Sequence, residues 1–395
     1  MRKTHVLRPM KKKKAARILY VRHGTKTVKS RKEKQVVSRT LKDLYKASDE
    51  GIVDMLVGDG ILQDMTGWQC PFCKKGILGP LKLIEGRGKR YRCRVKKCHK
   101  LVLPHSGHLI FKVGNGPKQT PLQDQAAALH CAILNVPQST AHCLTGLNHK
   151  TIGDIYRAND MTRSLYVREM EKSIKFGSDP GSKMWYDVEA DEVDLRKNIV
   201  DDGGSSPQDA TAAWEQWGGV QQRGAPRTLI LTRLKPKQTV TRAPGPGPIR
   251  EAEWKQFAQK HLPNRNVILH TDGARAYQLK VTGMLHDHVV HMKKKLKDKN
   301  GKPVKRNGKF VWILPKYAKV FKHIIPGTKK TVKCMGGSQV VDRFWQLLRS
   351  YLKCRSGAVG SASLRDRIRS AQWAHWYRAD DAWSKTGEML KHMCK

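Results

Sequence analysis

Four cysteines in the first third of the chain have the spacing of a metal site. Cys70 and Cys73 form a CxxC pair in the segment CPFC, and Cys93 and Cys98 form a second pair in YRCRVKKCHK. Two paired thiolate turns supply the tetrahedral sulfur set that Zn²⁺ prefers. The gap in the second pair is wider than usual, and His99 beside it is a possible substitute ligand. A redox thiol pair and incidental core cysteines are the alternatives. A closed four-ligand site would fold a small ribbon and do no chemistry.

Three acids that are far apart in the sequence have the chemistry of a divalent-cation site. Asp191 lies in the acidic segment VEADEVD, Asp272 ends the apolar run NVILHT, and Asp342 lies at the start of QVVDRFWQLLRSYL. Carboxylate oxygens suit Mg²⁺, and two such ions can clamp the attacking and leaving oxygens of a phosphoryl displacement. Taken alone, Asp272 before a glycine is more typical of a turn. Glu192 and Asp194 are expected to be solvated neighbours.

These acids can meet only if particular elements position them. The runs that end near Asp191 and Asp272 are typical of strands, which must be neighbours in one sheet. The segment from residue 339 has apolar residues at helical spacing, so Asp342 is expected in the first turn of an amphipathic helix. His288 and His291 follow the second strand, either as surface residues or as groups that position DNA or water. These elements predict an α/β domain.

A helical region separates the cysteines from the acids. TPLQDQAAALHCAILNV has apolar residues at helical spacing, and Pro137 is expected to stop that helix. Ser139 can cap a short helix, Gly146 fits a turn, and a second helix is expected over about residues 149–158. This pattern favours a helix-turn-helix that enters a DNA groove, and the alternative is a helical spacer. The expected DNA contacts are Lys150, Thr151 and Arg157.

Charge narrows the class of partner. The 395 residues include 77 Lys+Arg and 33 Asp+Glu, a formal net charge of +44. So large an excess indicates a polyanion, with nucleic acid the leading candidate. No stretch approaches the roughly 20 apolar residues of a membrane span, and no signal peptide is recognised, so no membrane partner is expected. We expect an intracellular protein, nuclear in a eukaryote and otherwise cytoplasmic or nucleoid-associated. Asp201–Pro207 and Pro236–Pro248 are predicted loops, and Lys293–Lys309 a basic exposed hairpin or loop.

The order of these motifs resembles a known family. The cysteine pairs, the helical region, VEADE, HTDGARAY, HDHVVH and QVVDRFWQLLRSYL are similar to Merlin-type transposases and related bacterial insertion-sequence transposases, over roughly residues 68–356. The resemblance implies an α/β fold with an RNase H-like mixed sheet flanked by helices. It also implies that this DDE-type domain cuts and joins DNA with Mg²⁺ or Mn²⁺. It makes Asp191 and Asp272 the first two catalytic acids. Asp342 stands where the family has Glu, and Gln339 where it has Asn. The segment of residues 200–222 is longer than in the family.

The expected organisation therefore has five parts: a basic, largely disordered arm (1–60), a zinc ribbon (61–115), a helix-turn-helix region (116–178), an RNase H-like catalytic domain (179–356) and a C-terminal helical tail (357–395). The expected function is a DNA transposase that binds terminal inverted repeats and target DNA. By the resemblance, it acts as a homodimer or larger assembly. The alternatives are a domesticated, inactive DNA-binding protein and an RNA-binding zinc protein, although the latter leaves the acids unexplained.

Overall fold

The computed structural model describes residues 37–114, 119–182, 184–200, 210–291, 293–353 and 357–394. Most of the predicted basic arm (1–36), the predicted loop Asp201–Pro207 and Cys354 lie outside these residues. Along the described chain, no helix combines the length and the apolar character that crossing a bilayer requires.

Two short helices open the described chain. Helix α1 (Leu41–Lys46) and helix α2 (Asp49–Gly58) each begin at a capping side chain, Thr40 and Ser48. Their apolar residues, among them Leu44 and Leu56, are buried. The prediction of a largely disordered arm is therefore wrong for residues 41–58, because apolar residues at helical spacing give this part of the arm a face to bury.

The four cysteines lie in the turns around a small antiparallel sheet of β1 (Lys82–Ile84), β2 (Gly88–Arg92) and β3 (Leu101–Val102). Tyr91 of β2 and Val102 of β3 pack with Cys70 and Cys93 in a separate buried cluster. Cys70 and Cys93 are thus part of the buried core of this unit.

The helical region contains α3 (Leu122–Ile133), α4 (Gln138–Thr145) and α5 (His149–Met170). Gly146 takes a left-handed conformation at the end of α4, with φ of 68°, as a turn residue should. Ser139 is not the cap, because Pro137 occupies that position and makes no side-chain cap bond. The second helix is also longer than predicted, since buried residues continue from Ile152 to Val167.

A six-stranded mixed sheet occupies the second half of the chain, built from β4 (Tyr186–Val200), β5 (Thr211–Gln222), β6 (Ile230–Arg233), β7 (Lys237–Val240), β8 (Val267–Thr271) and β9 (Met284–His288). The strand order is β6-β5-β4-β8-β9, and β7 pairs with β5. β4, β5 and β6 run antiparallel, whereas β8 and β9 run parallel to β4. The predicted loop Pro236–Pro248 is wrong at β7, because residues 237–240 contain no proline and can pair with a neighbouring strand.

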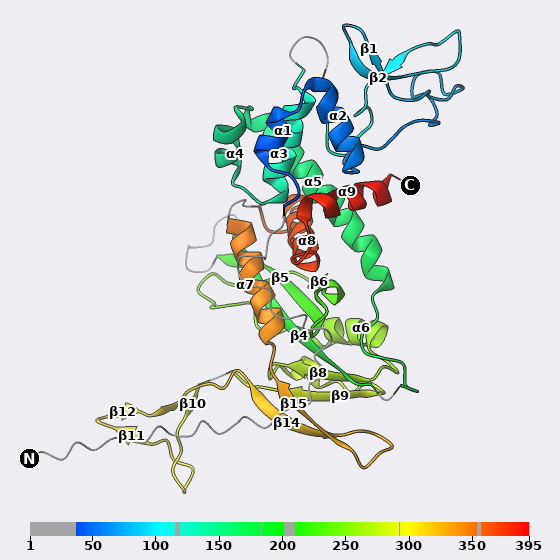
Figure 1. Ribbon diagram of the computed structural model, residues 1–395. Helices are drawn as coiled ribbons and strands as arrows, with labels where there is room; N and C mark the ends of the chain where they lie inside the picture. Colours follow the sequence, from blue (N-terminus) through cyan, green and yellow to red (C-terminus); the bar gives the residue numbers. More distant parts are fainter. Residues whose placement is uncertain are drawn as a thin grey trace, which may run out of the picture.

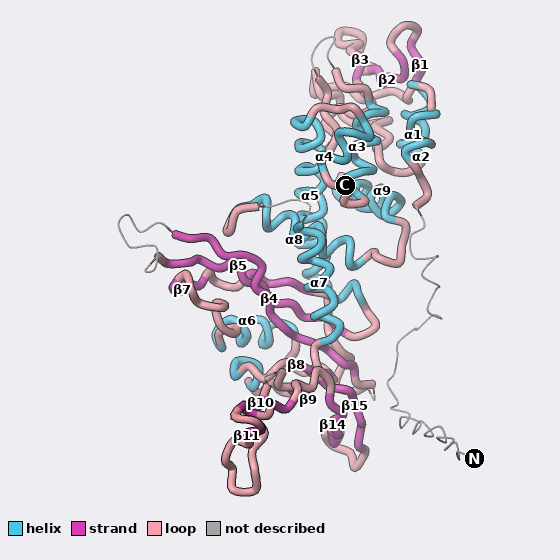
Figure 2. The backbone as a smooth tube through the Cα atoms, turned by 90° about the vertical axis from the view of Figure 1, so that its left-hand side faces the viewer, coloured by secondary structure: helices cyan, strands magenta, loops and turns pink. Residues whose placement is uncertain are grey.

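Helices cover both faces of this sheet (Figures 1 and 2). On one face, Val188 of β4 and Leu269 of β8 pack with Trp254 of α6 (Glu251–His261). On the other, Val193 of β4 packs in one cluster with Phe344 of α7 (Gln339–Lys353). The protein is therefore a mixed α/β protein whose sheet is flanked by helices, with a four-cysteine unit nearer the N-terminus.

The C-terminal helices connect the sheet to the helical region. Helix α8 (Ala362–Trp376) packs on α5 and α7, and its Trp376 indole donates to the carbonyl of Leu229 at 2.9 Å. Helix α9 (Ala382–Met393) meets α2, where the Trp383 indole donates to the Asp59 carboxylate at 2.9 Å. One apolar cluster accordingly runs from α1 through α5 to α8 and α9.

Three two-stranded antiparallel sheets lie between β9 and α7. They pair β10 (Lys294–Lys295) with β13 (Trp312–Ile313), β11 (Lys305–Arg306) with β12 (Lys309–Phe310), and β14 (Lys319–Ile324) with β15 (Thr331–Gly336). The predicted exposed hairpin over Lys293–Lys309 is confirmed, since the described strands of this segment are exposed.

Candidate functional site

The four cysteines form one cluster with the dimensions of a zinc site. The sulfurs of Cys70 and Cys98 lie 3.9 Å apart, and those of Cys73 and Cys93 lie 3.7 Å apart. Zn–S bonds of about 2.3 Å in a tetrahedron place neighbouring sulfurs about 3.8 Å apart. The cluster could therefore hold a structural Zn²⁺. His99 is not part of it, so the wide spacing of the second pair still brings four sulfurs together.

The backbone around the first cysteine pair favours a thiolate. Hydrogen bonds from the backbone N–H groups of Lys75 and Gly76 lower the pKa of Cys73 to about 6. Gly76 also has no room for a side chain, because a Cβ there would lie 2.7 Å from the sulfur of Cys93. Both features are typical of a turn that wraps around a metal–thiolate cluster.

Asp191 on β4 and Asp272, the residue after the end of β8, lie along neighbouring parallel strands. The pairing of β4 with β8 matches Glu189 with His270, so two further residues along each strand bring Asp191 level with Asp272. Asp272 follows the fully buried strand β8 and accepts a hydrogen bond from the backbone N–H of Ala274 at 2.9 Å. The turn interpretation of Asp272 thus accounts for one of its carboxylate oxygens only.

Asp342 reaches the same place from helix α7. Its carboxylate lies in hydrogen-bonding range of the Asp191 carboxyl group, and the charge of Asp272 also acts on Asp191. Ser338 donates its hydroxyl to Asp342 at 3.2 Å. Asp342 and Asp191 are therefore neighbours, although Asp is one methylene shorter than Glu at the third position, and Asp272 lies near enough for its charge to act on Asp191.

Trp345 closes over this group from one side. Its indole N–H donates to the Asp191 carboxylate at 3.1 Å. Gly219, which pairs with Asp191 across β4 and β5, provides the space for the ring, because a Cβ at this position would lie 2.7 Å from the indole. Trp345 is thus both a buried packing residue and a hydrogen-bond donor to this group.

The acids repel one another, and the structure records the consequence. Burial, followed by the charges of Glu192 and Asp342, raises the pKa of Asp191 well above its usual range. Glu192 faces the opposite side of β4, where Ile249 donates its backbone N–H at 3.1 Å and Tyr277 donates its hydroxyl. The prediction that Glu192 is a solvated neighbour is therefore wrong. A proton or a cation between Asp191 and Asp342 would relieve the repulsion.

A buried ion pair fixes the start of α7. Glu189 is fully buried and accepts a hydrogen bond from the Arg223 side chain at 2.6 Å. Its other oxygen accepts the backbone N–H groups of Val340 and Val341, at 2.6 and 3.1 Å. Arg223 also donates to the carbonyl of Gly337 at 2.8 Å. Because free N–H groups at a helix start attract an anion, Glu189 holds the helix that carries Asp342.

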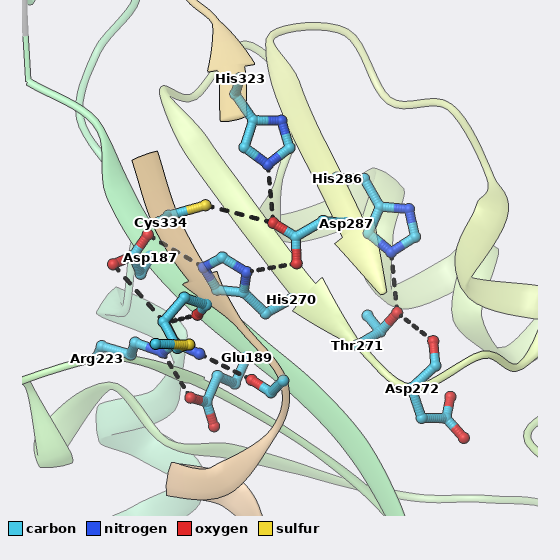
Figure 3. Close-up of polar contacts among 12 residues, drawn as sticks. Asp187, Glu189, Arg223, His270, Thr271, Asp272, His286, Asp287, His323 and Cys334 are labelled. Carbon is cyan, nitrogen blue, oxygen red and sulfur yellow. Dashed lines mark hydrogen bonds and ion pairs between the residues drawn. The ribbon is translucent and has the colours of Figure 1, made fainter. Parts of the chain in front are cut away.

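A second polar network joins the β14–β15 hairpin to the sheet (Figure 3). His270 on β8 contacts Asp287 at 2.8 Å and Asp187 at 3.1 Å, through its two ring nitrogens. His323 on β14 contacts Asp287 at 2.8 Å, and the Cys334 thiol donates to the same carboxylate. Although burial opposes it, hydrogen bonding to Asp187 and Asp287 raises the pKa of His270.

The polar network differs from the cysteine cluster in geometry. Its ligand atoms are close enough to surround an ion, with Cys334 common to two groups of three. However, nitrogen–oxygen distances of 2.8 Å are those of hydrogen bonds, whereas atoms bound to one Zn²⁺ at about 2.0–2.1 Å in a tetrahedron lie about 3.3 Å apart. We therefore interpret it as a hydrogen-bonded network, called the latch below, that joins the β14–β15 hairpin to the sheet.

The acids Asp191, Asp272 and Asp342 are not among the compact ligand groups found in the described residues.

The three predicted DNA contacts lie near the start of α5. Lys150 and Arg157 are exposed, and Thr151 is half-buried. Asn148 caps the helix by accepting the backbone N–H of Thr151 at 2.8 Å, and Arg157 pairs loosely with Asp154 at 3.5 Å. The two basic side chains are available to a partner, and the prediction about DNA stays a prediction.

No sequence pattern indicates the role of several residues around the acids and the polar network. Arg223 lies in an ordinary turn segment, QQRGAP, and nothing local indicates its contact with α7. Of the two histidines named from the sequence, His288 is exposed, and the ring centre of His291 lies 5.1 Å from that of Tyr317. The histidines of the latch are instead His270 and His323. A histidine inside the buried run VILHT was the available signal, because a buried imidazole needs hydrogen-bond partners.

Comparison with known proteins gives no further guide: no family model, curated protein or solved structure matches this chain.

Proposed function

We propose that this chain is a metal-dependent DNA transposase of the Merlin-type group, with an RNase H-like catalytic domain and Asp191, Asp272 and Asp342 as its catalytic acids. The observation that carries the proposal is the close approach of these acids, from β4, the end of β8 and α7, in a chain of net charge +44. The mixed sheet, with its acid-bearing strand in the centre and helices on both faces, is consistent with that fold.

The three acids would hold Mg²⁺ or Mn²⁺, which would activate the attacking oxygen and stabilise the leaving oxygen of the DNA phosphate. Asp191 interacts with both other acids and would favour the exchange of a proton for a cation, because burial and the charges of Glu192 and Asp342 disfavour its own charge. Trp345 orients one Asp191 oxygen, and the Glu189–Arg223 pair fixes α7. The shorter third acid is compatible with this role, since Asp342 already reaches Asp191.

The remaining parts of the proposal concern DNA. The α4–α5 pair would act as the helix-turn-helix that reads terminal inverted repeats, with Lys150, Thr151 and Arg157 as contacts. The four-cysteine unit would be a zinc ribbon that supports it. We propose that the protein acts as a homodimer or larger assembly, because both element ends must be cut together.

The test is cleavage of supercoiled plasmid DNA by the purified chain with Mn²⁺ or Mg²⁺. We expect nicking that falls by at least about 100-fold in each of Asp191→Asn, Asp272→Asn and Asp342→Asn, since each removes charge stabilisation of the reacting phosphate. Glu85→Gln, at an exposed acid in the cysteine unit, is the matched control and should cleave normally. Tight DNA binding without metal-dependent cleavage by the wild type would favour the alternative, a domesticated DNA-binding protein.

A further inference from the structure

Residues 293–333, which we call the lysine-rich arm, connect β9 to the end of the sheet where α7 begins. Lys and Arg occupy 15 of its 41 positions, and Asp298 is its one acid. Figures 1 and 2 show its hairpins projecting from the sheet, at the end of the molecule away from α1–α5. The arm is thus the most basic part of the described chain that reaches out from the body.

The arm has regular backbone structure but no core. Leu296 donates its backbone N–H to Val311 and accepts one from Val304, both at 2.8 Å, so the strands are paired. Yet no residue of 293–333 is fully buried, and apolar side chains face outward, with Leu314 77% and Tyr317 60% exposed. An isolated hairpin of this kind is only marginally stable in water. Its charge adds self-repulsion, so a polyanion would stabilise it.

Its cations are placed for an external partner. The ammonium group of Lys295 lies 3.8 Å from the centre of the Phe310 ring, and that of Lys305 lies 5.0 Å from it. Lys319 lies 5.1 Å from the Phe321 ring in the same way. Within the described residues, the Lys and Arg side chains of the arm form no ion pair with a carboxylate. Aromatic rings therefore position several lysines without neutralising them.

We propose that the lysine-rich arm binds the phosphate backbone of duplex DNA. Lysines supply sequence-independent charge, which is how proteins hold a DNA backbone. The choice of DNA rests on the proposed function: the arm leaves the sheet after β9, beside the strand that leads to Asp272, and returns through β15 to α7, which carries Asp342. A duplex held by the arm would continue past the three acids.

The test is the salt dependence of DNA binding by the full chain. Lys294, Lys299, Lys302 and Lys309 are exposed and change together to Gln; a second variant changes the same four to Arg. The control changes four exposed lysines elsewhere to Gln: Lys172, Lys175, Lys255 and Lys260. Binding of a labelled duplex is followed by fluorescence anisotropy between about 50 and 200 mM salt.

Each phosphate contact contributes about 0.9 to the slope of log affinity against log salt, so the Gln variant should lose up to about 3.6 from that slope. Its affinity should fall at least tenfold at low salt, while the Arg variant and the control keep the wild-type slope. An unchanged slope in the Gln variant, or an equal loss in the control, would overturn the proposal. Tighter binding of duplex RNA, with the same loss of slope, would assign the arm to RNA instead.

Binding is measured without divalent metal and in an Asp191→Asn background, where no cleavage takes place. The binding assay therefore tests the arm even if the wild type does not cleave DNA. The nicking assay in turn tests the three acids even if the arm does not bind DNA.

Discussion

Replacing Asp191 with Asn should stabilise the metal-free protein at alkaline pH. The raised pKa of Asp191 means that the folded protein keeps a proton that the unfolded chain has released. Stability therefore falls as pH rises from the usual carboxylate range towards the folded pKa, and the loss is complete above it. Asn carries no charge in this range, and its amide oxygen can still accept the Trp345 indole hydrogen bond.

The size of the effect follows from the neighbouring charges. Two like charges about 4 Å apart repel by about 4 kcal/mol at an effective dielectric constant of about 20. Retaining a proton limits this cost, so we expect Asp191→Asn to gain about 1–4 kcal/mol at pH 8 and much less at pH 5. Mg²⁺ at a hundred times its Kd would stabilise the wild type by about 2.7 kcal/mol. The variant should lose most of that gain, because it lacks one of the three carboxylates of the proposed site.

The assay is thermal unfolding of both proteins at pH 5 and pH 8, with and without Mg²⁺, and with Glu85→Gln as the control. The wild type should melt lower than Asp191→Asn at pH 8 without metal, and the gap should narrow when Mg²⁺ is added. If Mg²⁺ raises the melting temperature of both proteins equally, or if the variant is the less stable at pH 8, the three acids do not form the proposed shared cation site.

Three other perturbations test the elements around the acids. Glu189→Gln should cost about 3–5 kcal/mol, as expected for breaking a buried ion pair, and should raise amide hydrogen exchange in α7 more than in α6. Gly219→Val should displace the indole of α7 and alter tryptophan fluorescence, whereas Gly153→Ala, where a Cβ meets nothing within 4 Å, should not. Cys70→Ser should lower bound zinc by about one ion per chain in native mass spectrometry, while Cys143→Ser, at an exposed thiol, should leave it unchanged.

The parts of the fold that local patterns determine could be predicted from the sequence. The apolar run before Asp272 does form a buried strand, and the amphipathic pattern from residue 339 does form a helix with Asp342 in its first turn. The paired cysteines do converge on one cluster. In each case the spacing of residues within one segment carries the information, because helix and strand periodicity and metal-ligand spacing are local properties.

Contacts between distant segments could not be predicted in this way. Arg223 contacts Glu189 because β4 and β5 pair in one particular register. Trp345 contacts Asp191 because Gly219, in the neighbouring strand, leaves space for the indole. Residues 41–58 show the same limit: they follow a Lys- and Arg-rich segment that suggests a solvated arm, but their apolar residues pack in one cluster with those of helix α9, from the other end of the chain. Burial of this kind depends on tertiary structure, which charge and composition do not report.

Strand β4 explains why a chain so rich in cations has acids in its interior. Because alternate residues of a strand point to the same side, Asp187, Glu189 and Asp191 form one row on the α7 face. Asp187 binds His270 of the latch that holds the β14–β15 hairpin, Glu189 binds the first turn of α7, and Asp191 meets the acid that this helix carries. The first two carboxylates have cationic or N–H partners within the protein. Asp191 has Trp345 as a donor but acids among its charged neighbours, so it is the member of the row that would bind the proposed metal ion.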